Sequence, residues 1–150
     1  MRLMWRISIS DQLDPEIEAK VRESFAHQSM MTTLGAKLGA LSNGRATITA
    51  EVNDDLKQQQ GFAHGGLVFS IADSAAGYAA LTLLSRGSEI MTAEIKINYL
   101  SAGQGTLIAE GRVLKSGRRL IVVCADVWAE NDGVRKHVAV LQGTMIPVSA

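Results

Sequence analysis

The sequence predicts an α+β fold in which one long, buried helix is wrapped by a curved antiparallel sheet. Three observations predict it. Residues 65–85 are small and apolar around the whole circumference of a helix, which indicates a helix covered on nearly every side. Stretches that alternate apolar and polar residues come before and after this helix. Turn dipeptides join the later stretches, and elements grouped in this way are typical of the α+β class.

The first predicted element is a helical segment over about residues 14–34. Asp14 can cap a helix by accepting hydrogen bonds from its first free amides, and Pro15 suits the first helical position. The apolar side chains that follow at spacings of four, and so share one face, are Ile17, Val21 and Phe25. Residues 30–44 predict a turn or short helix that leads into an edge strand.

The core of the domain is predicted over about residues 45–147. Its first strand, residues 45–52, alternates apolar and polar side chains, and the polar stretch 53–60 indicates a loop before the helix. The strands predicted after the helix are residues 92–100, 106–115, 119–130 and 135–146. The hairpin signals between them are the dipeptides Ser116-Gly117 and Asp132-Gly133. We expect these four strands to pair in meander order and to wrap around the helix.

Length and composition exclude several classes of protein. At 150 residues the chain is predicted to form a single domain over residues 1–150. Its 15 basic and 15 acidic residues balance, so there is no basic field to attract nucleic acid or an anionic membrane surface. The one cysteine, Cys124, cannot form an internal disulfide and is expected to be an inert core thiol. Since residues 1–14 show no signal-peptide pattern, we expect a soluble, cytoplasmic protein.

The predicted helix at 65–85 contains one carboxylate, Asp73, within its apolar run. The run is long enough to cross a bilayer, but much of it is Ala, Gly and Ser, and a central Asp would add about 2.5–3.5 kcal/mol to insertion. A membrane span is therefore disfavoured. The positions that fall at i, i+3, i+4 and i+7 are Ser70, Asp73, Ser74 and Gly77. They form one narrow stripe on an otherwise apolar helix.

Gly65 and Gly66 mark the start of this helix, where the first backbone N–H groups have no intrahelical partner. These groups lie at the positive end of the helix dipole, and without side chains they can be approached closely by a substrate oxygen. Such a site can polarise a carbonyl and hold the charge that develops when it is attacked. The alternative, which the spacing supports equally, is that the two glycines only relieve crowding at a tight turn.

Asp73 is the candidate acid or base. A buried carboxylate is costly unless it is paired, and its raised pKa suits proton transfer. The alternative is a structural Asp that hydrogen-bonds a neighbouring strand or helix end. Asp73 follows Gly66 by seven residues, roughly 10 Å along the helix axis, which is too far for both to act on one carbonyl. If both act, the second comes from a neighbouring subunit.

A homodimer is also expected from the fold itself. A single curved sheet around one helix leaves the far side and the edges of that sheet to be covered, and 150 residues supply no further layer. Composite active sites, two per dimer, follow from this expectation together with the spacing of Gly66 and Asp73.

The stretch "HGGLVFSIADSAAGYAA" at residues 64–80 resembles the signature of the hotdog-fold thioesterases of the phenylacetate-pathway (PaaI-like) type, which are related to the 4-hydroxybenzoyl-CoA thioesterases. The stretches "MTAEIKINYLSAGQG" and "GRVLKSGRRLIVVCADV" are similar to the strands after the helix in that family. The resemblance covers about residues 45–147. It implies homodimers, usually paired into tetramers, that hydrolyse acyl-CoA thioesters without a cofactor or a metal.

The resemblance also implies roles for individual residues. The backbone N–H of Gly65 would donate to the oxyanion, and Asp73 of the other subunit would act as general base or nucleophile. His64 would position the carbonyl or order the loop, and Thr92 would orient the attacking water. Many members have an Asn six residues before the His, where this chain has Gln58. That substitution is compatible with a retained role, an altered acyl preference, or a site that binds without turnover.

The two ends of such a substrate have weaker candidates. CoA phosphates need positive charge near the pocket mouth, and the predicted hairpin offers Lys115, Arg118 and Arg119. Gly66, at the helix start, is a further substrate-binding candidate. An ordinary solvated hairpin tip explains the three cations equally well. The residues that could form a lid over the acyl group, or simply belong to the core, are Phe25, Met30, Met31 and Leu34.

Two other enzyme classes are disfavoured by the sequence, and two alternatives to the thioesterase stay open. The sequence has neither a metal-ligand spacing of His, Cys and Asp nor a Gly-x-Ser-x-Gly nucleophile motif, which disfavours a metalloenzyme and a serine hydrolase. A dehydratase or hydratase on the same fold, and a non-catalytic acyl-CoA-binding module, remain as alternatives.

Overall fold

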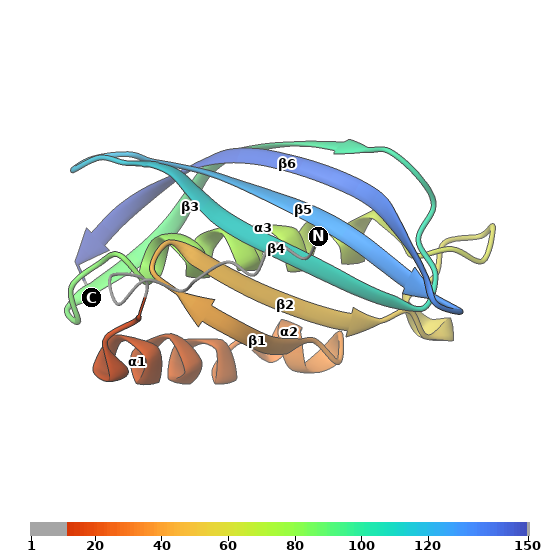
Figure 1. The fold of residues 1–150 in the computed structure, drawn as a ribbon, viewed down its shortest axis with the longest axis horizontal. Helices are drawn as coiled ribbons and strands as arrows, with labels where there is room; N and C mark the ends of the chain where they lie inside the picture. Colours follow the sequence, from red (N-terminus) through yellow and green to blue (C-terminus); the bar gives the residue numbers. More distant parts are fainter. Residues whose placement is uncertain (1–11, 150) are drawn as a thin grey trace, which may run out of the picture.

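The computed structural model describes residues 12–149 and has the predicted α+β architecture. A six-stranded antiparallel sheet curves around one central helix, α3 (Gly65–Leu81), while two N-terminal helices lie beside strand β1 (Figure 1). The N-terminal helices are α1 (Pro15–Ala26) and α2 (Ser29–Thr33), and a short 3-10 helix, η2 (Asp54–Leu56), precedes α3. The strands are β1 (Lys37–Ser42), β2 (Arg45–Glu51), β3 (Ser88–Tyr99), β4 (Thr106–Ser116), β5 (Ile121–Asn131) and β6 (Val134–Ser149).

The N-terminal helices agree with the predicted segment 14–34. The carboxylate of Asp14 caps α1 by accepting a hydrogen bond from the Glu16 amide at 2.8 Å, and Val21 is fully buried. Met31 and Leu34 belong to the hydrophobic core, whereas Met30 is exposed. Of the four residues proposed as lid or core, Met31 and Leu34 therefore belong to the core, and Phe25 packs against it with its ring edge-on to Tyr78.

The predicted hairpins are confirmed, but the predicted meander order is wrong. β4 pairs with β5 and β5 with β6, and the second turn has positive φ at both Asp132 and Gly133. The sheet order is β1-β2-β4-β5-β6-β3, so β3 pairs with β6 and lies at one edge. The connection at residues 100–105 crosses two strands instead of turning back, and that connection carries no hairpin dipeptide. Adjacency in sequence alone was thus an insufficient guide to the pairing of β3.

Helix α3 ends four residues before the predicted limit at residue 85. The hydroxyl of Thr82 donates to the Ala79 carbonyl at 2.7 Å and accepts a hydrogen bond from the Gly44 amide at 2.8 Å. This buried pair of contacts attaches the C-terminal end of α3 to the β1–β2 turn. The helix therefore ends where a tertiary contact holds it, and no local pattern at residues 82–85 predicts this end.

Helix α3 touches the sheet through its backbone at Gly111 of β4. A Cβ atom at this glycine would lie 2.2 Å from the Ala75 carbonyl oxygen and 2.6 Å from the Ala76 amide nitrogen. The absence of a side chain at Gly111 and the small alanines on α3 allow this close approach. As a result the helix lies deep in the concave face of the sheet, and its position is set by backbone contact.

Most of α3 is covered, as the sequence predicted. The residues that stay at least partly accessible include Gly66, Phe69, Ser70, Asp73 and Ser74, whereas Gly77 is buried. Three of the four residues of the predicted polar stripe, Ser70, Asp73 and Ser74, therefore lie on the open side of α3. In the described part of the chain, no helix combines the length and the apolar character that crossing a membrane requires.

Candidate active site

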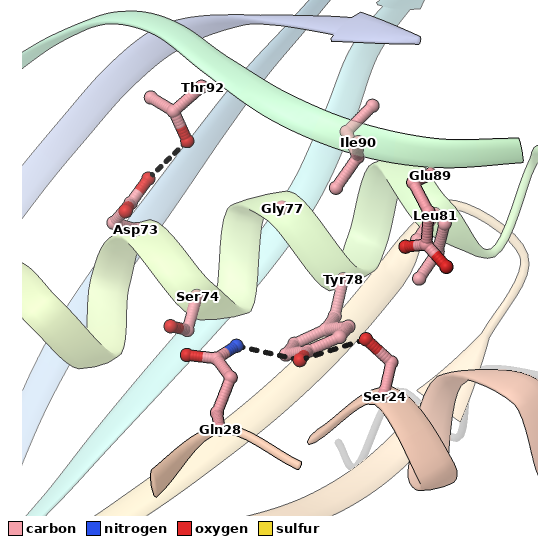
Figure 2. Close-up of a pocket in the computed structure, with 10 residues that line it drawn as sticks. All are labelled: Ser24, Gln28, Asp73, Ser74, Gly77, Tyr78, Leu81, Glu89, Ile90 and Thr92. Carbon is pink, nitrogen blue, oxygen red and sulfur yellow. Dashed lines mark hydrogen bonds between the residues drawn. The ribbon is translucent and has the colours of Figure 1, made fainter. Parts of the chain in front are cut away.

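Asp73 lies on the open side of α3 and faces Thr92 of β3. The Thr92 hydroxyl donates a hydrogen bond to Asp73 Oδ1 at 2.9 Å, as Figure 2 shows, and also lies 3.3 Å from the sulfur of Met145. Burial raises the pKa of Asp73, because removal from water disfavours the charged form, while the hydrogen bond from Thr92 opposes this effect. The result is a half-buried carboxylate that accepts a proton more readily than an ordinary Asp, as a general base requires.

A cavity of about 210 Å³ lies against Asp73. Its floor is the open side of α3, one wall is β3, and the other wall is formed by α1 and the turn into α2 (Figure 2). The residues that line it are Ser24, Gln28, Asp73, Ser74, Gly77, Tyr78, Leu81, Glu89, Ile90 and Thr92. Asp73 and Thr92, which the sequence analysis proposed together, are thus brought to one end of this cavity.

The start of α3 presents one free amide. His64 is the N-cap residue, and its Nδ1 accepts a hydrogen bond from the Gly66 N–H at 2.8 Å. The Gly65 N–H donates to no protein group within the described residues. Of the two glycines that the sequence singled out, Gly65 is therefore the one whose amide is open to a ligand, while the Gly66 amide is engaged by the cap. His64 orders the helix start through this contact.

Tyr99, at the end of β3, lies over Gly65. Its hydroxyl donates to the Gly65 carbonyl oxygen at 2.9 Å, and a Cβ atom at Gly65 would meet its ring at 3.2 Å. Burial raises the pKa of Tyr99, so the phenol keeps its proton and remains a donor. Tyr99 was not predicted as a site residue, because no local signal links positions 65 and 99, which meet only through the fold.

Gln58 folds back on its own loop. Its Oε1 accepts from the Gln60 amide at 2.5 Å and from the Phe62 amide at 3.4 Å. Gln58 also lines a second cavity of about 310 Å³, together with Gly65 and Tyr99. The side chain therefore orders the loop that leads into α3, beside the free amide of Gly65.

The candidate residues thus form two separate centres in one chain. Gln58, His64 and Gly65 lie together at the start of α3, whereas Asp73 and Thr92 lie further along the helix. The cavities beside these two centres share no lining residue.

Other candidates lie away from both centres. Lys115, Arg118 and Arg119 are exposed around the β4–β5 hairpin, at the end of the sheet opposite the start of α3 (Figure 1). Cys124 is buried, and this burial raises the pKa of its thiol, which disfavours the reactive thiolate. Among residues 12–149, no three His, Cys, Asp or Glu side chains are placed to hold a metal ion together.

Comparisons with known proteins agree on one family. The model of the thioesterase superfamily matches residues 60–136. A relative from Saccharolobus solfataricus, whose name places it among the esterases, is 32% identical over 117 residues, which cover 77% of each chain.

Solved structures share the fold. A thioesterase family protein from Silicibacter pomeroyi superposes with a TM-score of 0.86 at 36% identity, covering 89% of this chain and 99% of that one. The PaaI protein of E. coli, from the phenylacetic acid degradation operon, superposes with a TM-score of 0.81 at 22% identity. The match covers 93% of this chain and 98% of that one, and it shows the fold alone. A Streptococcus mutans protein solved with bound acetyl-CoA superposes with a TM-score of 0.68 at 30% identity, covering 76% of this chain and 89% of that one. The predicted fold, a long helix wrapped by an antiparallel sheet, is confirmed.

Proposed function

Because this chain belongs to the thioesterase superfamily, a family of thioester hydrolases, we propose that it hydrolyses acyl-CoA thioesters at composite sites formed by two copies of the chain. The observation that carries the proposal is the division of the candidate residues into two centres. Gly65 and Asp73 are eight residues apart on α3, about 12 Å along its axis. A base must lie within hydrogen-bond reach of the reacting groups or one water away. One carbonyl therefore cannot use both groups of the same chain.

Strand β3 relates the two centres. Thr92 of β3 contacts Asp73, and Tyr99 of β3 contacts Gly65. β3 ends the sheet, and its other side pairs with no strand among the described residues. Met91 is 60% exposed and Tyr99 is 52% exposed, although both are large hydrophobic residues. A long exposed edge of this kind favours pairing with another strand.

A second copy would complete the site by antiparallel pairing along β3. Antiparallel pairing about a two-fold axis near the middle of β3 would bring Thr92 of one subunit near Tyr99 of the partner subunit. Asp73 of one subunit then approaches the helix start of the other. The same operation creates an identical second site, so a dimer has two.

The reaction follows from these positions. The thioester carbonyl oxygen accepts a hydrogen bond from the Gly65 N–H at the positive end of α3, which stabilises the oxyanion. Asp73 of the other subunit takes a proton from a water molecule as that water attacks the carbonyl carbon. The carbon–sulfur bond then breaks, and the leaving CoA thiolate takes up the proton that Asp73 holds, which restores the carboxylate. Direct attack by the Asp73 carboxylate is the second route, and it passes through an acyl anhydride that water hydrolyses.

The CoA end is supported by charge and by similarity. Acetyl-CoA occupies the Streptococcus mutans protein, which is 30% identical to this chain. The hairpin cations Lys115, Arg118 and Arg119 have no ion-pair partner within the described residues and suit phosphate groups. Because the two-fold axis reverses β3, the hairpin of one subunit lies at the end where α3 of its partner begins.

Release of free CoA thiol from short, medium, long and aryl CoA esters tests the proposal. We expect the wild type to hydrolyse at least one class, and Asp73→Asn to lose turnover while it still binds CoA esters. Calorimetric titration of both proteins with the same esters supplies the binding control. Binding without turnover in the wild type would overturn the enzyme and indicate an acyl-CoA-binding module.

A further inference from the structure

We propose that the cavity beside Asp73 is the acyl pocket and that it selects a compact, neutral acyl group with a hydrogen-bonding substituent at its far end. The inference rests on the proposed function, because the role of Asp73 identifies the end of the cavity that holds the thioester carbonyl. From that end the cavity extends along α3 towards Tyr78 and Leu81, between β3 and α1 (Figure 2).

The size of the cavity limits the acyl group. Its volume is about 210 Å³, and an apolar cavity of about 150 Å³ can hold benzene. Tyr78 follows Asp73 by five residues, about 7.5 Å along the helix axis. The pocket thus has room for one ring or for a chain of a few carbons.

The far end of the cavity is polar and rigid. The Tyr78 hydroxyl accepts a hydrogen bond from Gln28 Nε2 at 2.6 Å and lies 3.3 Å from the Ser24 hydroxyl. The Tyr78 side chain is only 4% exposed, and its ring packs edge-on against Phe25 at 5.9 Å between centroids. The Tyr78 hydroxyl is therefore held at a fixed position at this end of the cavity.

Further polar atoms in this cavity lack protein partners. Ser74 Oγ and Gln28 Oε1 make no hydrogen bond within the described residues, and Figure 2 shows both oxygens turned to the same side. A purely apolar acyl chain would desolvate these atoms and leave them unpaired, which is unfavourable. A substrate with a hydroxyl or similar group at its far end would satisfy Gln28 Oε1, whose amide group contacts the Tyr78 hydroxyl.

The charge of the lining excludes an anionic substituent. Asp73 and Glu89 both line the cavity, and no Lys or Arg is among its lining residues. A carboxylate at the far end of the acyl group would meet repulsion from Glu89, and no cation among the described lining residues would offset it. The preferred substituent is therefore polar and neutral.

Gly77 makes the cavity testable without damage to the fold. A Cβ atom at Gly77 would lie 3.9 Å from Ile90 Cγ2 and 4.0 Å from the Met145 methyl carbon, which are ordinary contact distances. Alanine is also more favourable than glycine inside a helix, so Gly77→Ala should fold at least as well as the wild type. The added methyl group narrows the cavity between its Asp73 end and its Tyr78 end.

The first experiment compares Gly77→Ala with Gly87→Ala, whose Cβ would meet nothing within 4 Å. In Gly77→Ala, the ratio of kcat/KM for hexanoyl-CoA to kcat/KM for the shortest ester that the wild type hydrolyses should fall by about tenfold or more. Gly87→Ala should match the wild type on both esters. Equal effects of Gly77→Ala on both esters would overturn the pocket assignment.

The second experiment tests the polar end with Tyr78→Phe, which keeps the packing against Phe25 and removes the hydroxyl. The wild type should prefer ω-hydroxyhexanoyl-CoA over hexanoyl-CoA by about tenfold or more in kcat/KM, and Tyr78→Phe should lose this preference. A preference that persists in Tyr78→Phe, or that the wild type lacks, would refute polar recognition while ester hydrolysis itself stands. If the wild type hydrolyses no ester, the proposed function fails, and dissociation constants of the same esters for the same variants decide the pocket assignment.

Discussion

Replacement of Gly65 by proline removes the proposed oxyanion donor and leaves the helix in place. Gly65 is the first residue of α3, where the N–H group has no intrahelical acceptor and proline is favoured. The preceding residue, His64, has φ of −62° and ψ of 138°, the extended conformation that a residue before proline adopts. Gly65→Pro is therefore expected to remove one N–H group without unfolding the start of the helix.

The size of the effect follows from the number of free amides. The Gly66 N–H is held by His64 Nδ1 at 2.8 Å, which leaves the Gly65 N–H as the donor. Loss of one oxyanion donor lowers kcat by about 100- to 1,000-fold, or about 2.7–4 kcal/mol. Gly65→Ala is the matched control, because it retains the N–H and adds the same Cβ atom, which would press on the Tyr99 ring at 3.2 Å.

The assay is steady-state release of CoA thiol, with thermal unfolding measured in parallel. Gly65→Pro is expected to have a kcat about 100-fold or more below that of Gly65→Ala, at a similar Tm. If Gly65→Pro is folded and keeps the kcat of Gly65→Ala, the Gly65 amide does not bind the oxyanion, and the reasoning from the helix start is refuted.

Three further outcomes follow from the same contacts. Thr92→Val removes the hydrogen bond that lowers the pKa of Asp73, so the acidic limb of the kcat/KM profile should move to higher pH. Thr92→Ser keeps a hydroxyl and should leave the limb in place. An unmoved limb in Thr92→Val would contradict this role of Thr92. Burial raises the folded-state pKa of Asp73 above its unfolded value, so the stability of the protein falls as pH rises through the folded pKa. Asp73→Asn should therefore show an equal or higher Tm at neutral pH. A lower Tm would contradict a destabilising charge at Asp73. Gly111→Ala would place a Cβ 2.2 Å from the Ala75 carbonyl oxygen and should lower the free energy of unfolding in urea by about 1–3 kcal/mol. Gly87→Ala should leave the free energy of unfolding nearly unchanged. Wild-type stability of Gly111→Ala would show that α3 does not contact β4 at this position.

Elements that depend on local patterns could be predicted from the amino-acid sequence. The wide apolar run of α3, the alternating strands and the two hairpin dipeptides each contain their own signal, and the structure agrees with them. The open stripe at Ser70, Asp73 and Ser74 was also visible, because helical spacing places these residues on one side.

What the sequence analysis missed depends on contacts between distant residues. The place of β3 beside β6 follows from pairing across the whole sheet, and alternation along β3 suits any neighbour. Tyr99 reaches Gly65 across 34 positions, and Thr82 ends α3 through its contact with Gly44. The His64 cap was hidden as well, because His is not among the usual N-cap residues.

The central claim, a site shared by two subunits, is tested most directly by mixing two inactive variants. Asp73→Asn and Gly65→Pro, each with a different affinity tag, are co-expressed, and dimers that carry both tags are isolated. If Gly65 of one chain acts with Asp73 of the other, each mixed dimer has one intact site of two and should show about half of the wild-type activity. If both residues act within one chain, neither site is intact, and the mixed dimers should remain as inactive as the two parent variants.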